Sequence, residues 1–149
     1  MVETPSAEAA LRPAQLIAAA LIAGCVSFAA VVGVVVPMMS GSEGEPPSPP
    51  PAFGWIAWAG ALAGFTASFA VCRVLRRVPA EADAGTRAQA GLRATIAALA
   101  LNEGGALLAI ALALAARQLV PFFYAAAVGF AGMILHFPTR ARFTGGEPV

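Results

Sequence analysis

One carboxyl group in this chain lies where a charged carboxylate is costly. Glu103 stands inside a long apolar stretch, whereas the other seven acidic residues lie in tails or loops between such stretches. A charged carboxylate at the centre of a bilayer costs about 2.5–3.5 kcal/mol on insertion scales. A buried carboxyl group avoids that cost by taking up a proton. The sequence therefore predicts that Glu103 is protonated at rest and that its chemistry is the binding and release of a proton.

The residues beside Glu103 bear on this chemistry. Asn102 is a second polar residue in the same stretch, and Gly104 and Gly105 follow the carboxyl group directly. Successive helix positions differ in direction by about 100°, so Asn102 and Glu103 are expected to face different neighbours. The two glycines remove side-chain bulk, which lets another helix, a water or an ion come close. We predict that Glu103 and Asn102 bind an ion; the alternative is that both form hydrogen bonds to neighbouring helices.

Four long apolar stretches supply the elements that position these residues. The chain has 149 residues, of which 59% are hydrophobic and 11% charged, whereas soluble domains usually carry about 25% charged residues. A helix needs about 20 apolar residues to cross the hydrocarbon core of a bilayer. The predicted spans are residues 13–39, 52–72, 94–116 and 119–137. The predicted fold class is therefore all-α, a polytopic membrane protein with four transmembrane helices in two antiparallel hairpins.

The connections between the spans are short and polar, so we predict one membrane domain. Its parts are a leader (1–12), a membrane domain (13–142) with a proline-rich outer loop (40–51) and an arginine-rich loop (73–93), and a polar tail (143–149). Pro37 is expected to kink or stop the first helix. Residues 80–92 are expected to form a short surface helix that joins the third span.

Small residues recur every four positions in the second span, at Gly60, Gly64 and Ser68. Small side chains at that spacing let two helix backbones approach closely in a membrane. We predict that these residues pack against another helix, together with Gly104 and Gly105 in the third span. The sequence leaves open whether the partner helix belongs to the same chain or to another one.

The arginines are distributed unevenly between the two sides of the predicted spans. Eight lie on one side, at Arg12, Arg73, Arg76, Arg77, Arg87, Arg93, Arg140 and Arg142, and Arg117 alone lies on the other. Basic residues near span ends are enriched on the cytoplasmic side of membranes. We therefore expect both termini to be cytoplasmic, and we expect the location to be a bacterial inner membrane.

Several classes of function have no support in the sequence. There is no nucleophile motif, phosphate loop or cluster of metal ligands, so we expect neither an enzyme, a metal site nor a cofactor. The net charge of +1 and the lack of a basic patch with aromatics give no sign of nucleic-acid binding. Cys25 and Cys72 are expected to be small apolar residues at different depths. His136 is expected at the cytoplasmic interface, with a proton-relay role as the less favoured alternative.

A known family shares part of this pattern. A glycine- and alanine-rich helix, an arginine-containing loop and a helix reading Leu-Asn-Glu-Gly-Gly-Ala-Leu-Leu-Ala-Ile together resemble the proteolipid (c) subunit of rotary ATP synthases, over about residues 52–116. The resemblance implies that Glu103 is the carboxylate that binds and releases one ion as a ring of subunits turns. It also implies a proton as that ion, because no hydroxyl or glutamine follows Glu103 in the sodium-binding pattern. The loop at 73–93 is longer than the family's, and the first and fourth spans have no counterpart.

The predicted function is thus a small integral subunit of a larger membrane complex, proteolipid-like, with Glu103 as its proton-binding group. The expected partners are the lipid bilayer and other membrane subunits or further copies of the chain. The alternative is a non-catalytic accessory or scaffold subunit in which Asn102 and Glu103 bond to partner helices. A small oligomeric transporter is a third, less favoured alternative.

Overall fold

The structure is a computed structural model that describes residues 7–40, 48 and 50–139. Most of the predicted proline-rich loop, the polar tail and the first half of the leader lie outside these residues. The described chain forms four α-helices: α1 (Ala7–Ser40), α2 (Pro51–Leu75), α3 (Ala84–Ala116) and α4 (Val120–Leu135). The predicted all-α class is confirmed.

The helix ends follow local sequence signals. α2 begins at Pro51, where the missing backbone N–H of a first-turn proline costs nothing, and it ends four residues before Pro79. α3 begins after Asp83, whose side chain accepts a hydrogen bond from the Thr86 backbone N–H at 2.8 Å. α3 ends at Arg117, which adopts a left-handed conformation with φ 52°. This turn lets α4 begin only three residues later.

The structure contradicts the expected stop of the first helix at Pro37, and it revises the expectation for residues 80–92. Pro37 lies inside α1 and does not end it. The proline removes only the hydrogen bond to the Gly33 carbonyl, and proline is common in membrane helices. Residues 84–92 are not a separate surface helix but the first turns of α3, which runs without a break for 33 residues. No proline stands between the Asp83 cap and the apolar part of α3, so the helix continues.

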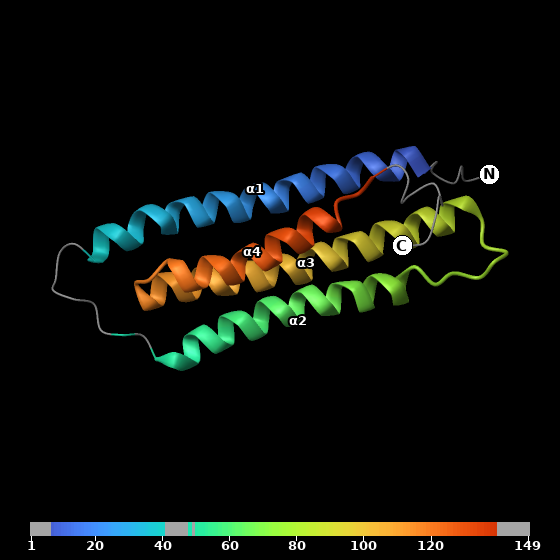
Figure 1. The fold of residues 1–149 in the computed structure, drawn as a ribbon. Coiled ribbons are helices and arrows are strands. Elements are labelled where there is room, and N and C mark those ends of the chain that lie inside the picture. Colours follow the sequence, from blue (N-terminus) through green and yellow to red (C-terminus); the bar gives the residue numbers. More distant parts are fainter. Residues whose placement is uncertain (1–6, 41–47, 49, 140–149) are drawn as a thin grey trace.

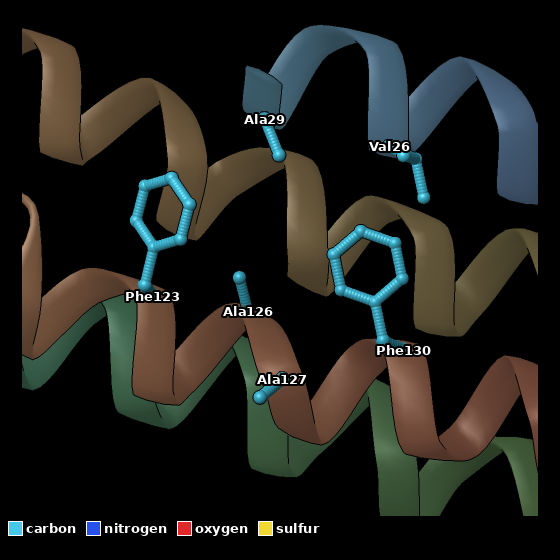
Figure 2. A pocket seen from close by; sticks show the side chains of 6 residues that line it. All are labelled: Val26, Ala29, Phe123, Ala126, Ala127 and Phe130. Atoms are coloured by element: carbon cyan, nitrogen blue, oxygen red, sulfur yellow. The ribbon is translucent and has the colours of Figure 1, made fainter. Parts of the chain in front are cut away.

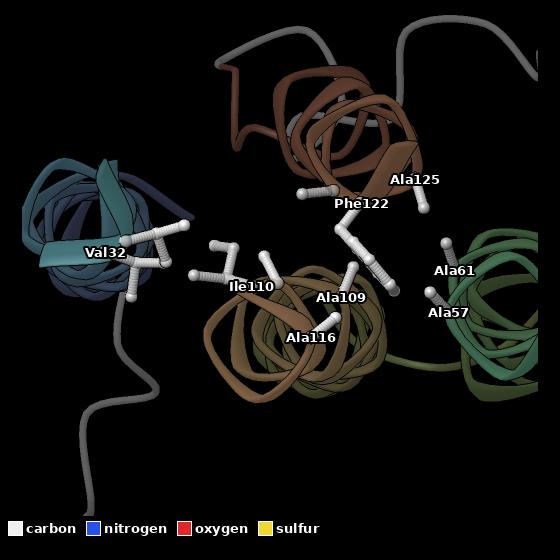
Figure 3. Packing of buried hydrophobic residues seen from close by; sticks show 11 residues of the cluster. Val32, Ala57, Ala61, Ala109, Ile110, Ala116, Phe122 and Ala125 are labelled. Atoms are coloured by element: carbon white, nitrogen blue, oxygen red, sulfur yellow. The ribbon is translucent and has the colours of Figure 1, made fainter. Parts of the chain in front are cut away.

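Helix α3 is the centre of the arrangement (Figure 1). It contacts each of the other three helices, and α2 also contacts α4. Viewed along the helices, α1 and α2 lie on opposite sides of α3, while α4 lies above it (Figure 3). The described parts of α1 and α2 make no contact with each other, so these two helices do not pack as a hairpin.

Helices α2, α3 and α4 enclose a core of small residues around one aromatic ring. The Phe122 side chain reaches from α4 between the other two helices and is 2% exposed (Figure 3). Buried alanines surround it, namely Ala57 and Ala61 on α2, Ala109, Ala113 and Ala116 on α3, and Ala125 and Ala126 on α4. Because alanine keeps the helix axes close together, the three helices form a tight unit.

Helix α1 is attached to this unit along one narrow seam. Its buried residues lie on a single face, with Val32 against Ile110 of α3 (Figure 3). Between α1 and α4 an apolar pocket of about 300 Å³ remains, lined by Val26, Ala29, Phe123, Ala126, Ala127 and Phe130. The Phe123 and Phe130 rings point from α4 toward α1 without closing it (Figure 2).

Three of the helices are long and apolar enough to cross a membrane. These segments are Leu11–Met39, Pro51–Leu75 and Ala84–Ala116. α4 is apolar too, but its 16 residues rise only about 24 Å, less than the thickness of the hydrocarbon core. The length and composition of these helices are thus compatible with a membrane protein. Apolar side chains such as Leu16, Met38 and Trp55 are exposed on their outer surface, which suits contact with lipid.

Candidate functional site

Glu103 lies on the side of α3 that faces α1. Its side chain is half-buried, and Leu99 and Ile110 on the same side of the helix are fully buried. Across the contact, Cys25 of α1 lies level with Glu103, because Val32 packs on Ile110 seven residues further along both helices, which run in the same direction (Figures 1 and 3). Glu103 therefore sits in the α1–α3 seam, at the level of Cys25.

No described group neutralises the Glu103 carboxyl group. None of the residues in the described ranges donates a hydrogen bond to it or forms an ion pair with it. The nearest arginines along α3 are Arg93 and Arg117, ten and fourteen residues away. At 1.5 Å per residue these lie about 15 Å and about 21 Å along the helix axis. A charged Glu103 would therefore be uncompensated within the described chain.

Asn102 faces a different helix. It is completely buried against α4, where its side chain lies beside Gly132. The amide Nδ2 donates a hydrogen bond to the Ala98 carbonyl of its own helix at 2.8 Å. Its Oδ1 has no hydrogen-bond partner among the described residues. The structure therefore does not bring Asn102 and Glu103 into one site, and the Nδ2 hydrogen bond of Asn102 lies within α3.

Three of the four glycines predicted to pack do so between α2 and α3. A methyl group added at Gly64 would lie 2.5 Å from the Leu101 carbonyl oxygen, and one at Gly105 would lie 3.1 Å from the Ala61 Cα. A methyl group at Gly60 would lie 2.6 Å from Leu108 Cδ2. These contacts join two helices of the same chain, which is one of the two possibilities that the sequence left open.

Ser68 and Gly104 differ in their placement. Ser68 is fully buried, and its hydroxyl donates to the Phe65 carbonyl of its own helix at 2.6 Å. Gly104 is exposed, and a methyl group added there would meet nothing within 4 Å. Gly104 thus does not pack against another described helix, because its position on α3 turns outward while that of Gly105 turns toward α2. The open space beside Gly104 lies one residue from Glu103.

Two glycines of α4 were missed by the sequence analysis. A methyl group at Gly129 would lie 2.7 Å from the Asn102 carbonyl oxygen and 3.0 Å from the Ala106 backbone nitrogen. A methyl group at Gly132 would overlap the Asn102 side chain. Their spacing of three residues in an apolar segment, Gly129-Phe130-Ala131-Gly132, was the signal that could have identified this packing face.

His136 contacts an aromatic ring, and neither cysteine forms a disulfide. His136 follows α4, is 7% exposed, and its ring lies 4.7 Å from that of Phe69 on α2 in an edge-on arrangement. Cys25 and Cys72 are both free thiols. Over the described residues, no three histidine, cysteine or acidic side chains gather as they would around a metal ion.

Helix α3 thus packs closely against α2 and α4, and the Glu103 carboxyl group lies outside these close contacts. No known protein family, curated protein or solved structure matches this chain. The resemblance to proteolipid subunits therefore stays a prediction from the residues around Glu103.

Proposed function

We propose that this chain is a small, non-enzymatic integral membrane subunit in which Glu103 binds and releases a proton within the bilayer. The observation that carries the proposal is the position of Glu103. It is a half-buried carboxyl group in the α1–α3 seam with no hydrogen bond and no ion pair to the described chain. A carboxyl group in that position is favoured in its protonated form, since a bare charge in a membrane is costly.

The placement in the membrane is part of the proposal. α1, α2 and α3 have the length and composition of spans, and we propose that α4 completes a fourth span together with the residues that follow it. The described arginines favour an orientation with both termini in the cytoplasm, because six of the seven lie at one end of the bundle. We infer that the host membrane is the inner membrane of a bacterium.

The surroundings of Glu103 favour a carboxyl group that can exchange its proton with water or a partner, and not one that is permanently buried. The seam between α1 and α3 is narrow, and the adjacent Gly104 position leaves open space. A water molecule or a partner helix can therefore reach the carboxyl group from that side. The proteolipid resemblance suggests the same role, with further copies of this chain or other membrane subunits as partners.

Labelling with a hydrophobic carbodiimide tests the proposal. The reagent reacts with a protonated carboxyl group, so Glu103 should be modified in folded protein in a bilayer, and the rate should fall as the pH rises. Mass spectrometry of the α3 peptide locates the adduct. Glu103→Gln should abolish it, whereas the exposed loop residue Glu81 should react mainly with a water-soluble carbodiimide. An unmodified Glu103 at every pH in folded protein would overturn the proposal.

Activity measurements in the host membrane distinguish the proposal from the alternative of an accessory subunit. Glu103→Gln keeps hydrogen-bonding groups but cannot release a proton. If the protein handles protons, this variant should assemble normally and lose pH-dependent activity of the complex. An assembled variant with unchanged activity would instead indicate that Glu103 serves only in helix contacts.

A further inference from the structure

The arginines at one end of the bundle lie at similar depth although they come from three helices. Gly105 packs at Ala61, and α2 and α3 run in opposite directions, so Arg73 and Arg93, each twelve residues from this contact, lie at the same level. Val32 packs on Ile110, and α1 and α3 run in the same direction (Figures 1 and 3). Twenty residues earlier, Arg12 lies level with position 90 of α3, within one helix turn of Arg93. The arginine-lined end of the bundle consists of Arg12, Arg73, Arg76, Arg77, Arg87 and Arg93.

These arginines are exposed and have no acidic partner in the described chain. All six side chains are exposed, and none forms an ion pair with a described residue. Arg87 alone is held, by a hydrogen bond from its Nη2 to the Ala80 carbonyl at 2.7 Å. Of the two acidic residues in the adjoining loop, Asp83 caps α3 through Thr86, and Glu81 forms no ion pair with the described arginines. The positive charge at this end is therefore available to an anion from outside.

An open apolar face leads away from this charge along α3. Arg93, Ala100, Gly104 and Ala111 are all exposed, and their spacings of seven, four and seven residues place them on one side of the helix. α1 and α2 flank this side without touching each other (Figure 3). A molecule that fits the whole surface has an anionic end at Arg93 and a long apolar body along the alanines.

We propose that this surface binds an anionic phospholipid, with its phosphate at Arg73 and Arg93 and an acyl chain along the open face of α3. Guanidinium groups bind phosphate oxygens in pairs of parallel hydrogen bonds. Arginines at the headgroup level of a membrane also attract anionic lipids electrostatically. The inference rests on the membrane placement in the proposed function, but not on protonation of Glu103.

Lipid binding to the purified full-length protein in mild detergent tests this proposal. Native mass spectrometry counts the bound molecules of phosphatidylglycerol and, separately, of phosphatidylcholine with the same acyl chains. The wild type should prefer phosphatidylglycerol. Each of Arg73→Gln and Arg93→Gln should weaken that binding about fivefold, and the double variant about 25-fold. Phosphatidylcholine binding should not change.

Arg117→Gln is the matched control, because Arg117 lies at the other end of the bundle. It should leave the preference intact. Gly104→Leu should reduce binding of both lipids without changing their ratio, since the added side chain occupies the open face. High salt should weaken the preference through screening.

Several outcomes would overturn the inference. They are equal binding of both lipids by the wild type, an equal loss in Arg117→Gln, displacement of the lipid by inorganic phosphate, and self-association through the face that Gly104→Leu blocks. Extraction from native membranes separates this failure from that of the proposed function. Protein released by alkaline carbonate would refute the membrane placement, whereas retained protein with no lipid preference refutes only the lipid site.

Discussion

The contact of α3 with α2 and α4 differs in kind from its contact with α1. Toward α2 and α4 the backbones themselves meet, at Gly64, Gly105 and Gly129, and the Asn102 side chain lies directly against Gly132. Toward α1 the contact runs through side chains such as Val32, and a pocket of about 300 Å³ stays open between α1 and α4. Membrane helices associate mainly through close packing, because lipid is as apolar as their side chains. We therefore expect α1 to be the more easily displaced helix.

The two polar residues of α3 are divided between these regions. Asn102 is sealed between α3 and α4, where any movement would require two backbones to separate. Glu103 lies in the seam with α1, where a small displacement of one helix can admit water. A titratable group can exchange its proton only where water or a partner reaches it, so the looser region is the one suited to the proposed proton exchange.

The largest expected effect comes from forcing the tight region apart. Gly64→Ala places a methyl group 2.5 Å from the Leu101 carbonyl oxygen, and a backbone atom cannot move without shifting the helix. We expect the free energy of unfolding to fall by about 1–3 kcal/mol, as for other overpacked contacts. Unfolding by denaturing detergent or steric trapping in bicelles measures the change.

The control is Gly104→Ala, because a methyl group there meets nothing within 4 Å. This variant should be neutral or slightly more stable, since alanine favours helix over glycine by up to about 1 kcal/mol. Equal losses in Gly64→Ala and Gly104→Ala would show that the α2–α3 contact is not the tight one.

A second pair of variants examines the α3–α4 contact. Gly132→Ala should destabilise the protein by about 1–3 kcal/mol, because the methyl group overlaps the Asn102 side chain. Asn102→Ala removes that obstacle, so the double variant should regain much of the loss. The expected coupling is about 1 kcal/mol or more in a double-mutant cycle.

Gly129→Ala provides the matched comparison. Its methyl group would meet the Asn102 carbonyl oxygen at 2.7 Å, which is backbone and stays in Asn102→Ala. Asn102→Ala should therefore not rescue Gly129→Ala. Rescue of both glycine variants, or of neither, would contradict the packing of Asn102 against Gly132.

The two cysteines report on the looser region. Cys25 is buried in the α1–α3 seam, whereas Cys72 is half-buried near the end of α2. Val32→Ala removes part of the seam and should favour opening of α1 by about 1 kcal/mol, which raises Cys25 labelling by a membrane-permeant maleimide about fivefold. Cys72 labelling should stay constant. Val34→Ala, at an exposed position of α1, should change neither rate.

Labelling of both cysteines in parallel would mean that α1 opens only when the whole bundle does. The difference between the two regions would then have no dynamic consequence. Proton exchange at Glu103 would in that case need a path other than displacement of α1.

The sequence predicted the helices well because apolar stretches in a membrane protein have few alternatives. The packing stripe Gly60, Gly64 and Ser68 was also visible, since close approach requires small residues at regular spacing. The partner of each face was not visible, because periodicity gives the direction of a side chain but not the helix opposite it. Two-hairpin packing was expected from the order of the chain, yet α1 packs on α3 and does not touch the described part of α2.

The sequence predicted Glu103 as a candidate site residue but not the helix that faces it. Glu103 stood out because a charge in an apolar stretch needs an explanation. Its location in the α1–α3 seam depends on where α1 lies, which no local pattern specifies. Gly132 became significant only once α4 was placed beside Asn102.

The smallest expected effect lies outside both regions, at the start of α3. Hydrogen bonds from the Thr86 backbone N–H and hydroxyl group hold the pKa of Asp83 below its ordinary value of 3.8. A carboxylate with a lowered pKa stabilises the folded helix above its unfolded pKa, and the effect is lost as the pH falls through the folded value. Hydrogen exchange of residues 84–88 should therefore be protected near neutral pH and lose protection below pH 3.8.

Asp83→Ala should abolish this pH dependence by exposing the first-turn amides at all pH values. Glu81→Ala is the control, because it removes an exposed carboxylate without a cap contact, and it should leave the pH dependence unchanged. The apolar part of α3 should exchange slowly in every variant, because its amides lie within the bundle. If the first turn frays together with that part, α3 opens as a single unit. The tight contacts with α2 and α4 would then extend their protection to the Asp83 cap, well beyond the residues that form them.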